Sequence, residues 1–377
     1  MNTSETLSSH SSVGKFEWLN HPLTRAATRI GFEAEALSYY LEKINPLWSL
    51  TSMKAQVVHI IDETHDVKTF VLRPNAHWQG VSAGQHIGVA VEVGGVIHKR
   101  RYSSSKAEAT DKSTNKTVQI TVKRVTGGVV SNHFYNQAQV GDVIGLDAAE
   151  GDFVLPDKLP SKLLVLTAGS GITPVFSQVA TLLIAGYKGS IEFVHYVRTP
   201  EDCIFGKQLY QLAEQYDNFE VQWCYENSKS KNSPERFSSK QIQNRVTDYT
   251  ERHTLLCGPA GFMSVVRKHW DDLGLNDSLS FEYFGAPPMG AKDEVDAEIT
   301  LKTGKQIQLR AGESILDSLI ANGETPKYGC KRGVCHECKC LKTNGAVKNL
   351  LTGNVSDSGE EYIQLCISAP VTNVTLA

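Results

Sequence analysis

The sequence predicts three successive domains: an antiparallel β-barrel, a doubly wound α/β domain and a small α+β domain. Short alternating apolar segments separated by turn residues run from about Met53 to Leu155, which is typical of an antiparallel barrel. Strand-like and helix-like segments then alternate from Lys162 to Phe284, as in a parallel sheet covered by helices. A group of cysteines that begins at Cys330 follows near the C-terminal end.

Bulk composition agrees with a multidomain chain. The 377 residues are 41% hydrophobic and 21% charged, enough for several hydrophobic cores. We place an N-terminal extension at 1–51, the barrel at 52–157, the α/β domain at 158–284, a linker at 285–295 and the last domain at 296–377. The net charge of −3 argues against a nucleic-acid-binding protein. A signal peptide and an apolar run of the ~18 residues that span a bilayer are not seen, so we expect a cytoplasmic protein.

The N-terminal extension has two interpretations. Apolar side chains recur at helical spacing between Ile30 and Ile44, and Pro46 closes the run. The segment could form a helical lid packed on the barrel. It could instead be an amphipathic surface for peripheral contact with a membrane or for a partner protein. The few Lys and Arg residues there favour the lid.

Two local sequences stand out in the predicted barrel. At Lys99–Ser105 a strand ends in cationic, aromatic and hydroxyl residues, and Gly127-Gly128 leads into Ser131 and a predicted helix at Asn132–Ala138. An arginine can bind a phosphate with its fork of donors. A glycine pair before a helix leaves N–H groups for a pyrophosphate. Either sequence alone could also be a surface charge run or an ordinary turn.

The α/β domain begins with the apolar strand Leu163–Leu166 and a glycine-rich turn, Gly169–Pro174. Such a turn lets the backbone approach a nucleotide at the carboxyl ends of the strands. It is not G-x-G-x-x-G, so the usual dinucleotide fingerprint is absent. Further strands are predicted at Ile191–Val197, Phe219–Tyr225 and Thr254–Cys257, and helices at Gly206–Gln215 and Ala260–Trp270.

The last domain is predicted to have a hairpin at Ala297–Leu309, a helix at Glu313–Ala321 and then a metal-binding loop. Cys330, Cys335, Cys338 and the distant Cys366 have the spacing C-x4-C-x2-C…C, that of a plant-type [2Fe–2S] cluster. Structural zinc sites usually have two C-x2-C pairs, which this chain lacks. Disulfide frameworks belong to short secreted domains, whereas this chain is long and shows no secretion signal. Both comparisons favour the cluster. Cys340 is a surplus thiol, either a buried small residue or an alternative ligand.

With these motifs in this order, residues 52–377 resemble the ferredoxin–NADP reductase superfamily with a plant-type ferredoxin fused at its C-terminus. Arg100-x-Tyr102-Ser103 matches the family's flavin motif. The match implies that Arg100 holds a flavin phosphate, Tyr102 packs on the flavin ring and Ser103 lies near flavin N5. Gly127-Gly128-x-x-Ser131 matches the pyrophosphate segment, which favours FAD over FMN.

The resemblance extends to the nucleotide site. Gly169–Pro174 matches the G-x-G-x-x-P nicotinamide-nucleotide loop, and Cys257-Gly258-Pro259 matches the C-G-P turn that places a Cys beside the nicotinamide. The expected catalytic residues are Ser103, Thr173 and Cys257. The expected cofactor-binding residues are Arg100, Arg101, Tyr102, Ser103, Gly127, Gly128, Ser131, Gly169, Ser170, Gly171, Ile172, Thr173, Pro174, Arg198, Thr199, Arg236, Gly258 and Pro259.

NADPH is favoured over NADH. After the strand Ile191–Val197 come Arg198 and Thr199, and no acidic residue at the strand end could bind a ribose diol. Arg198 could pair with a 2′-phosphate, and Arg236 is a second candidate. Either arginine could also be a solvated surface charge.

The whole pattern is similar to one subgroup, the reductase partners of bacterial fatty-acyl (stearoyl-CoA) desaturases, through Pro46–Leu50, Gly333–Cys338 and Val347–Gly353. Reductases of aromatic-ring oxygenases are near relatives. The resemblance implies that electrons pass from NADPH through FAD and a [2Fe–2S] cluster to a membrane di-iron desaturase, or alternatively to a Rieske-type oxygenase. A redox-sensing ferredoxin with a vestigial reductase half is a third hypothesis, which the intact flavin and nucleotide motifs oppose.

Overall fold

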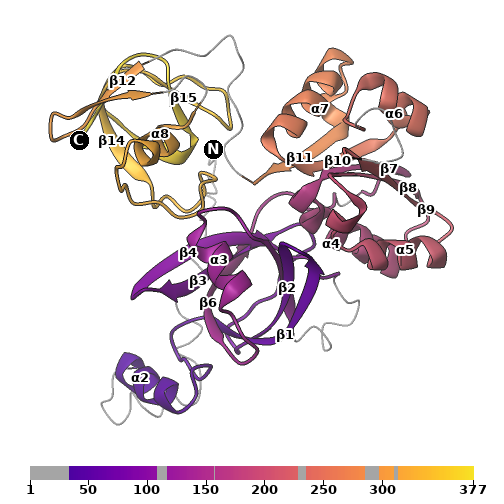
Figure 1. Ribbon diagram of the computed structural model, residues 1–377, viewed down its shortest axis with the longest axis horizontal. Coiled ribbons are helices and arrows are strands. Elements are labelled where there is room, and N and C mark those ends of the chain that lie inside the picture. The colour runs from indigo at the N-terminus through magenta and orange to yellow at the C-terminus, as the bar shows by residue number, and fades with distance from the viewer. Residues whose placement is uncertain (1–33, 108–116, 157, 228–234, 285–296, 310–312) are drawn as a thin grey trace, which may run out of the picture.

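The computed structural model describes residues 34–107, 117–156, 158–227, 235–284, 297–309 and 313–377. These residues form three units, each built on its own sheet, with a short helix set apart from them (Figure 1). The predicted linker, 285–295, lies outside the described residues. In the part of the chain that is described, no helix combines the length and apolar character needed to cross a bilayer.

The first unit is the predicted barrel. Its strands pair antiparallel in the order β4-β3-β6-β1-β2-β5, and a bridge between Ser104 and Ile120 joins the end of β4 to β5. The sheet therefore closes on itself beside the flavin motif. The strands are β1 (Lys54–Thr64), β2 (Val67–Pro74), β3 (His86–Val93), β4 (Val96–Ser103), β5 (Val118–Lys123) and β6 (Val143–Glu150).

The helix of this unit, α3 (Val129–Asn136), begins earlier than the predicted Asn132. Gly127 has a positive φ of 73°, and Gly128 follows in an extended conformation at the N-cap. The turn is thus completed within the glycine pair, and the helix can start at once. Phe134 on α3 is buried and packs edge-to-face on Phe70, with ring centroids 4.9 Å apart.

The second unit confirms the doubly wound sheet. All five strands are parallel, in the order β11-β10-β7-β8-β9, and a separate hydrophobic cluster covers each face. The elements are β7 (Lys162–Ala168), α4 (Ile172–Ile184), β8 (Ser190–Val197), α5 (Gly206–Gln215), β9 (Phe219–Tyr225), α6 (Ser239–Arg245), β10 (His253–Gly258), α7 (Ala260–Asp272) and β11 (Leu279–Tyr283). Helix α6 and strand β11 were not predicted.

The third unit is an α+β arrangement. Its mixed sheet has the order β13-β12-β18-β14-β16, with β12 and β18 parallel, and Ser314 caps α8 by accepting a hydrogen bond from the Asp317 N–H (3.1 Å). The elements are β12 (Ala297–Thr300), β13 (Gln306–Leu309), α8 (Ile315–Ala321), β14 (Lys339–Asn344), β15 (Val347–Asn349), β16 (Glu361–Gln364), β17 (Ser368–Pro370) and β18 (Val374–Leu376). The segment Gly329–Cys338, between α8 and β14, is called the cluster loop below.

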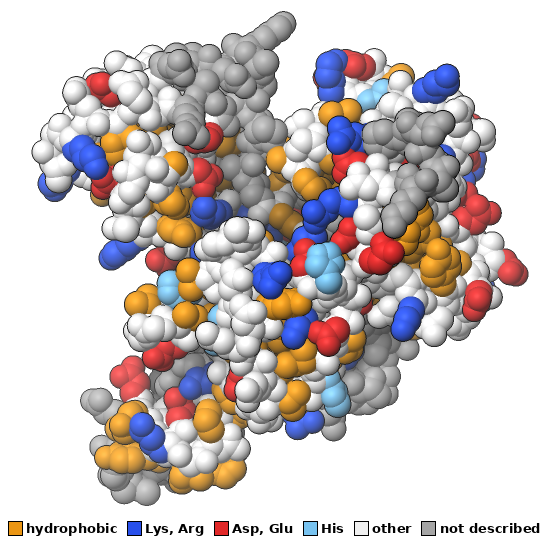
Figure 2. Space-filling view, viewed as in Figure 1, with side chains coloured by type: hydrophobic (Ala, Val, Ile, Leu, Met, Phe, Trp, Pro, Cys, Tyr) orange, Lys and Arg blue, Asp and Glu red, His pale blue; other side chains and the backbone are white. Residues whose placement is uncertain are grey.

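The N-terminal helix α2 (Ala34–Ile44) differs from the expected lid. It is joined to the barrel by the ion pair of Glu42 with Lys54 (2.8 Å), yet its aromatic side chains point into solvent. Tyr39 and Tyr40 are 59% and 62% exposed, and hydrophobic side chains gather at the lower end of the molecule in Figure 2, where Figure 1 shows α2. Helical spacing alone could not tell which face is covered. The earlier part of the predicted helix lies outside the described residues.

Candidate active site

One cavity of about 620 Å³ brings the predicted flavin residues together. The end of β4, the glycine turn and the first turn of α3 form its barrel side, Ser170 and Thr173 belong to the nucleotide loop, and Cys330 belongs to the cluster loop. Residues from all three units therefore surround one space. The predicted flavin residues that line it are Arg100, Arg101, Tyr102, Ser103, Gly127, Gly128 and Ser131.

The glycine turn leaves the N-terminus of α3 open to this cavity. A Cβ on Gly128 would lie 2.5 Å from Ser131 Oγ, so a larger residue would displace that hydroxyl. The hydroxyl accepts a hydrogen bond from the Val125 N–H (3.2 Å), which fixes the turn. A turn that exposes N–H groups at a helix N-terminus fits the pyrophosphate of FAD.

The arginines of the flavin motif have protein partners. Arg100 Nη1 donates to the carbonyl of Lys99 (2.7 Å) and to that of Gly329 in the cluster loop (3.2 Å). Arg101 forms an ion pair with Glu150 and lies 2.9 Å from His86 Nε2. Both arginines still line the cavity. For Arg100 to hold a flavin phosphate, as predicted, its guanidinium must share these contacts or exchange them.

Tyr102 fits the predicted position against the flavin ring. Its ring meets Phe134 edge-on, with centroids 6.0 Å apart, and burial raises the pKa of its hydroxyl. The tyrosine therefore stays neutral and presents a mainly apolar surface to the cavity.

Nucleotide-loop glycines allow the loop to approach the C-G-P turn. A Cβ on Gly171 would lie 2.4 Å from the Cys257 carbonyl oxygen, and one on Gly258 would lie 3.2 Å from Ala168 Cβ. Thr173 Oγ1 donates to the Ser170 carbonyl (3.1 Å). Gly171, Ile172 and Pro174 are buried and support the loop, while Ser170 and Thr173 face the cavity.

Cys257 lies deeper than the resemblance implied. Its side chain is fully buried in the hydrophobic cluster that lies between the sheet and α4. Burial, together with the nearby carboxylate of Glu282, raises the pKa of the thiol well above its usual value. It is therefore a neutral thiol behind the nucleotide loop, and its contact with the nicotinamide stays a prediction.

A second cavity, of about 610 Å³, adjoins the first at Ser170. Arg198 and Arg236 both line it, as predicted for groups that bind the nucleotide. Arg236 forms an ion pair with Glu226, which follows β9 and lines the same cavity. Thr199 is not among the residues that line this cavity, and its hydroxyl donates to Asp202 (3.1 Å), which does line it. The other lining residues include Gly169, Tyr196, Phe237, Pro259 and Phe262.

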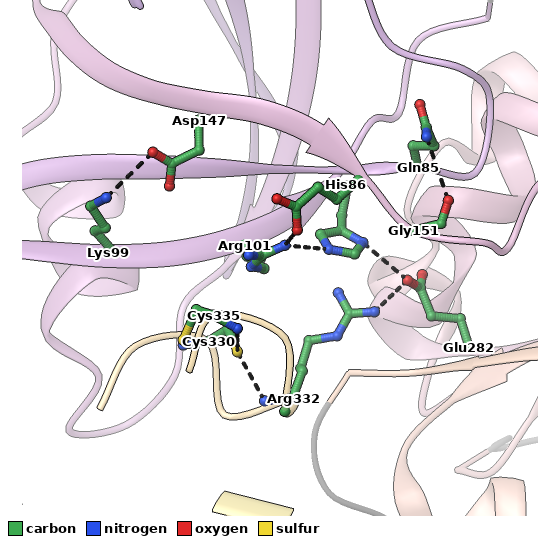
Figure 3. Close-up of polar contacts among 12 residues, drawn as sticks. Gln85, His86, Lys99, Arg101, Asp147, Gly151, Glu282, Cys330, Arg332 and Cys335 are labelled. Carbon is green, nitrogen blue, oxygen red and sulfur yellow. Dashed lines mark hydrogen bonds and ion pairs between the residues drawn. The ribbon is translucent and has the colours of Figure 1, made fainter. Parts of the chain in front are cut away.

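A contact that the sequence did not predict lies at Glu282 on β11 (Figure 3). Its carboxylate lies 3.4 Å from His86 Nδ1 and 3.5 Å from Ser103 Oγ, and it forms an ion pair with Arg332 of the cluster loop. Burial alone would raise the pKa of Glu282, but His86 and Arg332 outweigh it and hold the pKa below its usual value. His86 and Glu282 belong to no local motif, so the sequence carried no signal for them. Ser103 lies in the flavin motif and Arg332 in the cluster loop, but their motifs do not predict that both meet Glu282.

All eight cysteines lie in described residues, and all are free thiols. The predicted ligands form two interacting pairs, Cys330 with Cys335 and Cys338 with Cys366. A hydrogen bond from Cys366 lowers the pKa of Cys338 to about 6. In the cluster loop, the N–H of Arg332 donates to Cys330 Sγ (3.3 Å).

The sulfur positions bear on whether the four cysteines could hold one metal ion or two. No three of the four sulfur atoms, all of which the structure describes, lie within 4.8 Å of one another. The sulfurs around one tetrahedral zinc would lie about 3.8 Å apart, given a Zn–S distance of about 2.3 Å. Two separate thiol pairs fit a binuclear cluster, in which each iron takes two cysteines.

Comparison with known proteins identifies the first two units. The family "Oxidoreductase FAD-binding domain" matches residues 54–155, and "Oxidoreductase NAD-binding domain" matches residues 165–268. An "NADPH oxidoreductase" of Mycobacterium tuberculosis is 31% identical over 334 residues, which are 88% of this chain and 85% of that protein. The chain belongs to the ferredoxin reductase family. It is accordingly an NAD(P)H-dependent flavin oxidoreductase.

Other members of the ferredoxin reductase family resemble this chain over most of its length. The glycine betaine monooxygenase reductase subunit of Chromohalobacter salexigens is 27% identical over 360 residues, which are 87% of this chain and 96% of the relative. The solved structure of phthalate dioxygenase reductase superposes with a TM-score of 0.58 at 21% identity, covering 86% of this chain and 98% of that one. This likeness in structure shows a shared fold.

Proposed function

We propose that this reductase passes electrons from NADPH through FAD and a [2Fe–2S] cluster to a terminal oxygenase. The observation that carries the proposal is the shared cavity, which Tyr102 and Ser103 line from the barrel and Cys330 lines from the cluster loop. A cluster bound by Cys330 would therefore border the flavin site. NADPH gives two electrons at once, a cluster accepts one, and a flavin can do both.

The chain's own groups would bind and orient the two cofactors. Ser103, with its hydroxyl at the cavity wall, would donate a hydrogen bond at flavin N5. Thr173 and Ser170 would position the nicotinamide, since they border the flavin cavity from the nucleotide side. Such fixed groups lower the barrier by orientation and by stabilising charge at N5.

NADPH is the proposed nucleotide. Arg198 and Arg236 line the nucleotide cavity, and a guanidinium can bind a 2′-phosphate through two parallel hydrogen bonds. Glu226 already binds Arg236, so a 2′-phosphate would compete with this carboxylate. A comparison of kcat/KM for NADPH and NADH tests the preference, and a clear preference for NADH would refute it.

The terminal acceptor is proposed from the relatives. The Chromohalobacter protein is named as the reductase subunit of a monooxygenase, so an oxygenase is our first candidate. A fatty-acyl desaturase is the second candidate, because the chain resembles desaturase reductases at Pro46–Leu50 and because α2 exposes two tyrosines. Tyrosine is enriched at membrane–water interfaces, where such a desaturase would lie.

The experiment has three stages. First, iron and acid-labile sulfide are measured on the purified protein, and its flavin is compared with FAD and FMN standards by chromatography. Second, NADPH-dependent reduction of cytochrome c is followed in the wild type and in Cys335→Ser. We expect both to reduce ferricyanide, which accepts electrons from the flavin, and only the wild type to reduce cytochrome c rapidly.

The third stage identifies the acceptor. The reductase is combined with NADPH and either a Rieske-type oxygenase or desaturase-containing membranes, and product is measured by mass spectrometry. Turnover of the desaturase alone would exchange the order of the two candidates. A wild-type protein that holds a cluster but reduces no acceptor with NADPH would instead support the redox-sensing alternative.

A further inference from the structure

The cluster loop contacts the nucleotide sheet through a buried ion pair. Arg332 on the loop binds Glu282 on β11 (Figure 3), and their side chains are only 11% and 7% exposed. Two opposite charges buried to this degree depend on each other, because removal of either one leaves the other without water to solvate it. The pair therefore fixes the loop against the second unit.

Glu282 also faces the barrel. Ser103 Oγ donates toward its carboxylate at 3.5 Å, and His86 Nδ1 lies 3.4 Å from it. One carboxylate thus lies where the barrel, the nucleotide sheet and the cluster loop meet. Of its three partners, Arg332 carries a permanent positive charge.

The barrel makes a second contact with the same region. Arg100 Nη1 donates to the Gly329 carbonyl (3.2 Å), and the Arg100 guanidinium lies 5.2 Å from the centre of the Tyr328 ring. A guanidinium at this distance from an aromatic ring is attracted to it. Cys330, which follows Gly329 in the chain, lines the flavin cavity. The first cysteine of the loop is thereby held at the cavity wall.

We propose that the ion pair between Glu282 and Arg332 is the docking contact that holds the cluster loop against the flavin cavity. The inference rests on the proposed function, because it requires a cluster in the loop. A bound flavin would accept the two electrons of the NADPH hydride and would pass them singly to a cluster held in the loop. The terminal acceptor would have to remove the first electron before the cluster could take the second.

The ion pair would affect the transfer of electrons from the flavin to the cluster. Electron transfer weakens steeply with distance, so the rate of cluster reduction depends on how closely the loop is docked. Hydride transfer would take place between the barrel and the nucleotide sheet, so Arg332 bears on it less directly than Glu282, which also contacts Ser103. Glu282 and Arg332 are therefore positioning residues for electron transfer from the flavin to the cluster.

The test compares Arg332→Gln and Glu282→Gln with the wild type, as full-length protein loaded with FAD and cluster. Small-angle X-ray scattering measures docking directly, and we expect the radius of gyration to increase in both variants. Anaerobic stopped-flow absorbance separates flavin reduction from cluster reduction. We expect cluster reduction to slow about tenfold or more relative to flavin reduction.

Further variants make the result specific. The double variant should be no slower than the slower single variant, because both substitutions remove one contact. Arg332→Lys should restore part of the rate, since it keeps the charge. Lys305→Gln is the matched control, because Lys305 pairs with Glu324 within the third unit (2.5 Å). It should change neither the scattering nor the ratio of the two rates.

Each outcome bears on a defined claim. A wild type without iron and sulfide would refute the proposed function. A wild type that reduces its cluster, together with an Arg332→Gln variant of unchanged scattering and unchanged rate ratio, would refute only this inference. If Arg332→Gln loses iron, the Glu282→Gln variant decides, since Glu282 lies outside the cluster loop.

Discussion

The carboxylate of Glu282 lies 3.5 Å from the hydroxyl of Ser103, although the two residues are 179 positions apart in the sequence. Ser103 ends a barrel strand, and Glu282 lies on the last strand of the nucleotide sheet. The contact joins the two halves of the candidate active site. It also means that Ser103 has a hydrogen-bond acceptor before any flavin is bound.

Replacement of Ser103 should slow hydride transfer. In Ser103→Ala we expect flavin reduction by NADPH to slow about 100-fold, since a donor at flavin N5 is lost, with little change in nucleotide affinity. Stopped-flow reduction over a range of NADPH concentrations separates the two quantities. The matched control is Ser104→Ala, because the Ser104 hydroxyl is buried and makes no hydrogen bond. Equal rates in wild type and Ser103→Ala would contradict the assigned role.

Nucleotide preference should depend on Arg236 and Glu226. Arg236→Ala should lower kcat/KM for NADPH about tenfold or more while leaving NADH turnover nearly unchanged, because only NADPH carries the 2′-phosphate. Glu226→Gln should raise kcat/KM for NADPH, since it frees Arg236 from its ion pair. Arg198→Ala shows whether the second arginine contributes. An Arg236→Ala variant that loses both nucleotides equally would indicate a structural role instead.

Because the nucleotide loop approaches the C-G-P turn closely, substitution of Gly171 by a larger residue should destabilise the fold. The added Cβ of Gly171→Ala would meet the backbone of Cys257 and Gly258 at 2.4 and 2.6 Å. Backbone atoms cannot rotate away, so we expect a loss of about 1–3 kcal/mol in the free energy of unfolding. Gly261→Ala is the control, because nothing lies within 4 Å of its Cβ position on helix α7. That variant should gain roughly 0.5–1 kcal/mol, measured by urea denaturation.

Acid should destabilise the nucleotide sheet through His195. The ring is fully buried and hydrogen-bonded to Thr167 (2.7 Å), and burial lowers its pKa from 6.5 to about 3. Below pH 6.5 the unfolded chain binds a proton that the folded protein rejects. The stabilisation is complete above pH 6.5 and is lost as pH falls toward 3, by about 2 kcal/mol at pH 5.

The measurement is urea denaturation at pH 7 and pH 5 for wild type and His195→Gln. Glutamine does not titrate, so the variant should lose less stability between these two pH values than the wild type does. Equal losses in the two proteins would show that other groups account for the acid sensitivity.

Cys340 should not be a cluster ligand. Its sulfur is half-buried and lies 3.8 Å from the Leu341 carbonyl oxygen, and it belongs to the hydrophobic core of the third unit. Cys340→Ser should therefore keep full iron and sulfide content and the visible absorbance of the cluster. Cys335→Ser, by contrast, should lose them. Loss of iron in Cys340→Ser would revive the alternative ligand assignment.

Local sequence patterns predicted most of the helices and strands, but they did not predict the contacts between the three units. The apolar strand Leu163–Leu166 and its glycine turn indicated a parallel sheet, because burial on both faces leaves a continuous apolar run. Strand β11 was missed because only Glu282 of its five residues is buried. Glu282 and His86 carry no local signal, and the motif that contains Arg332 does not predict its partner, since these contacts depend on how the three units pack together.

Cys257 shows the limit of motif transfer. The C-G-P turn was found from its letters, but the side-chain direction follows from the pleat of β10, which turns the thiol toward α4. A motif fixes the path of the backbone. Neighbouring strands decide which of its side chains face the ligand.

Strand β11, which carries Glu282, ends at Tyr283, and β12, the first strand of the unit that carries Arg332, begins at Ala297. Glu282, which binds Arg332, therefore lies close in the sequence to the segment that connects the two units. Two surfaces joined by a short stretch of chain meet at an effective concentration of about millimolar, so a docking contact is occupied most of the time if its dissociation constant is below about millimolar. An external acceptor that needs the face of the cluster loop must compete with this internal partner, and its apparent affinity falls by the fraction of time that the loop is docked.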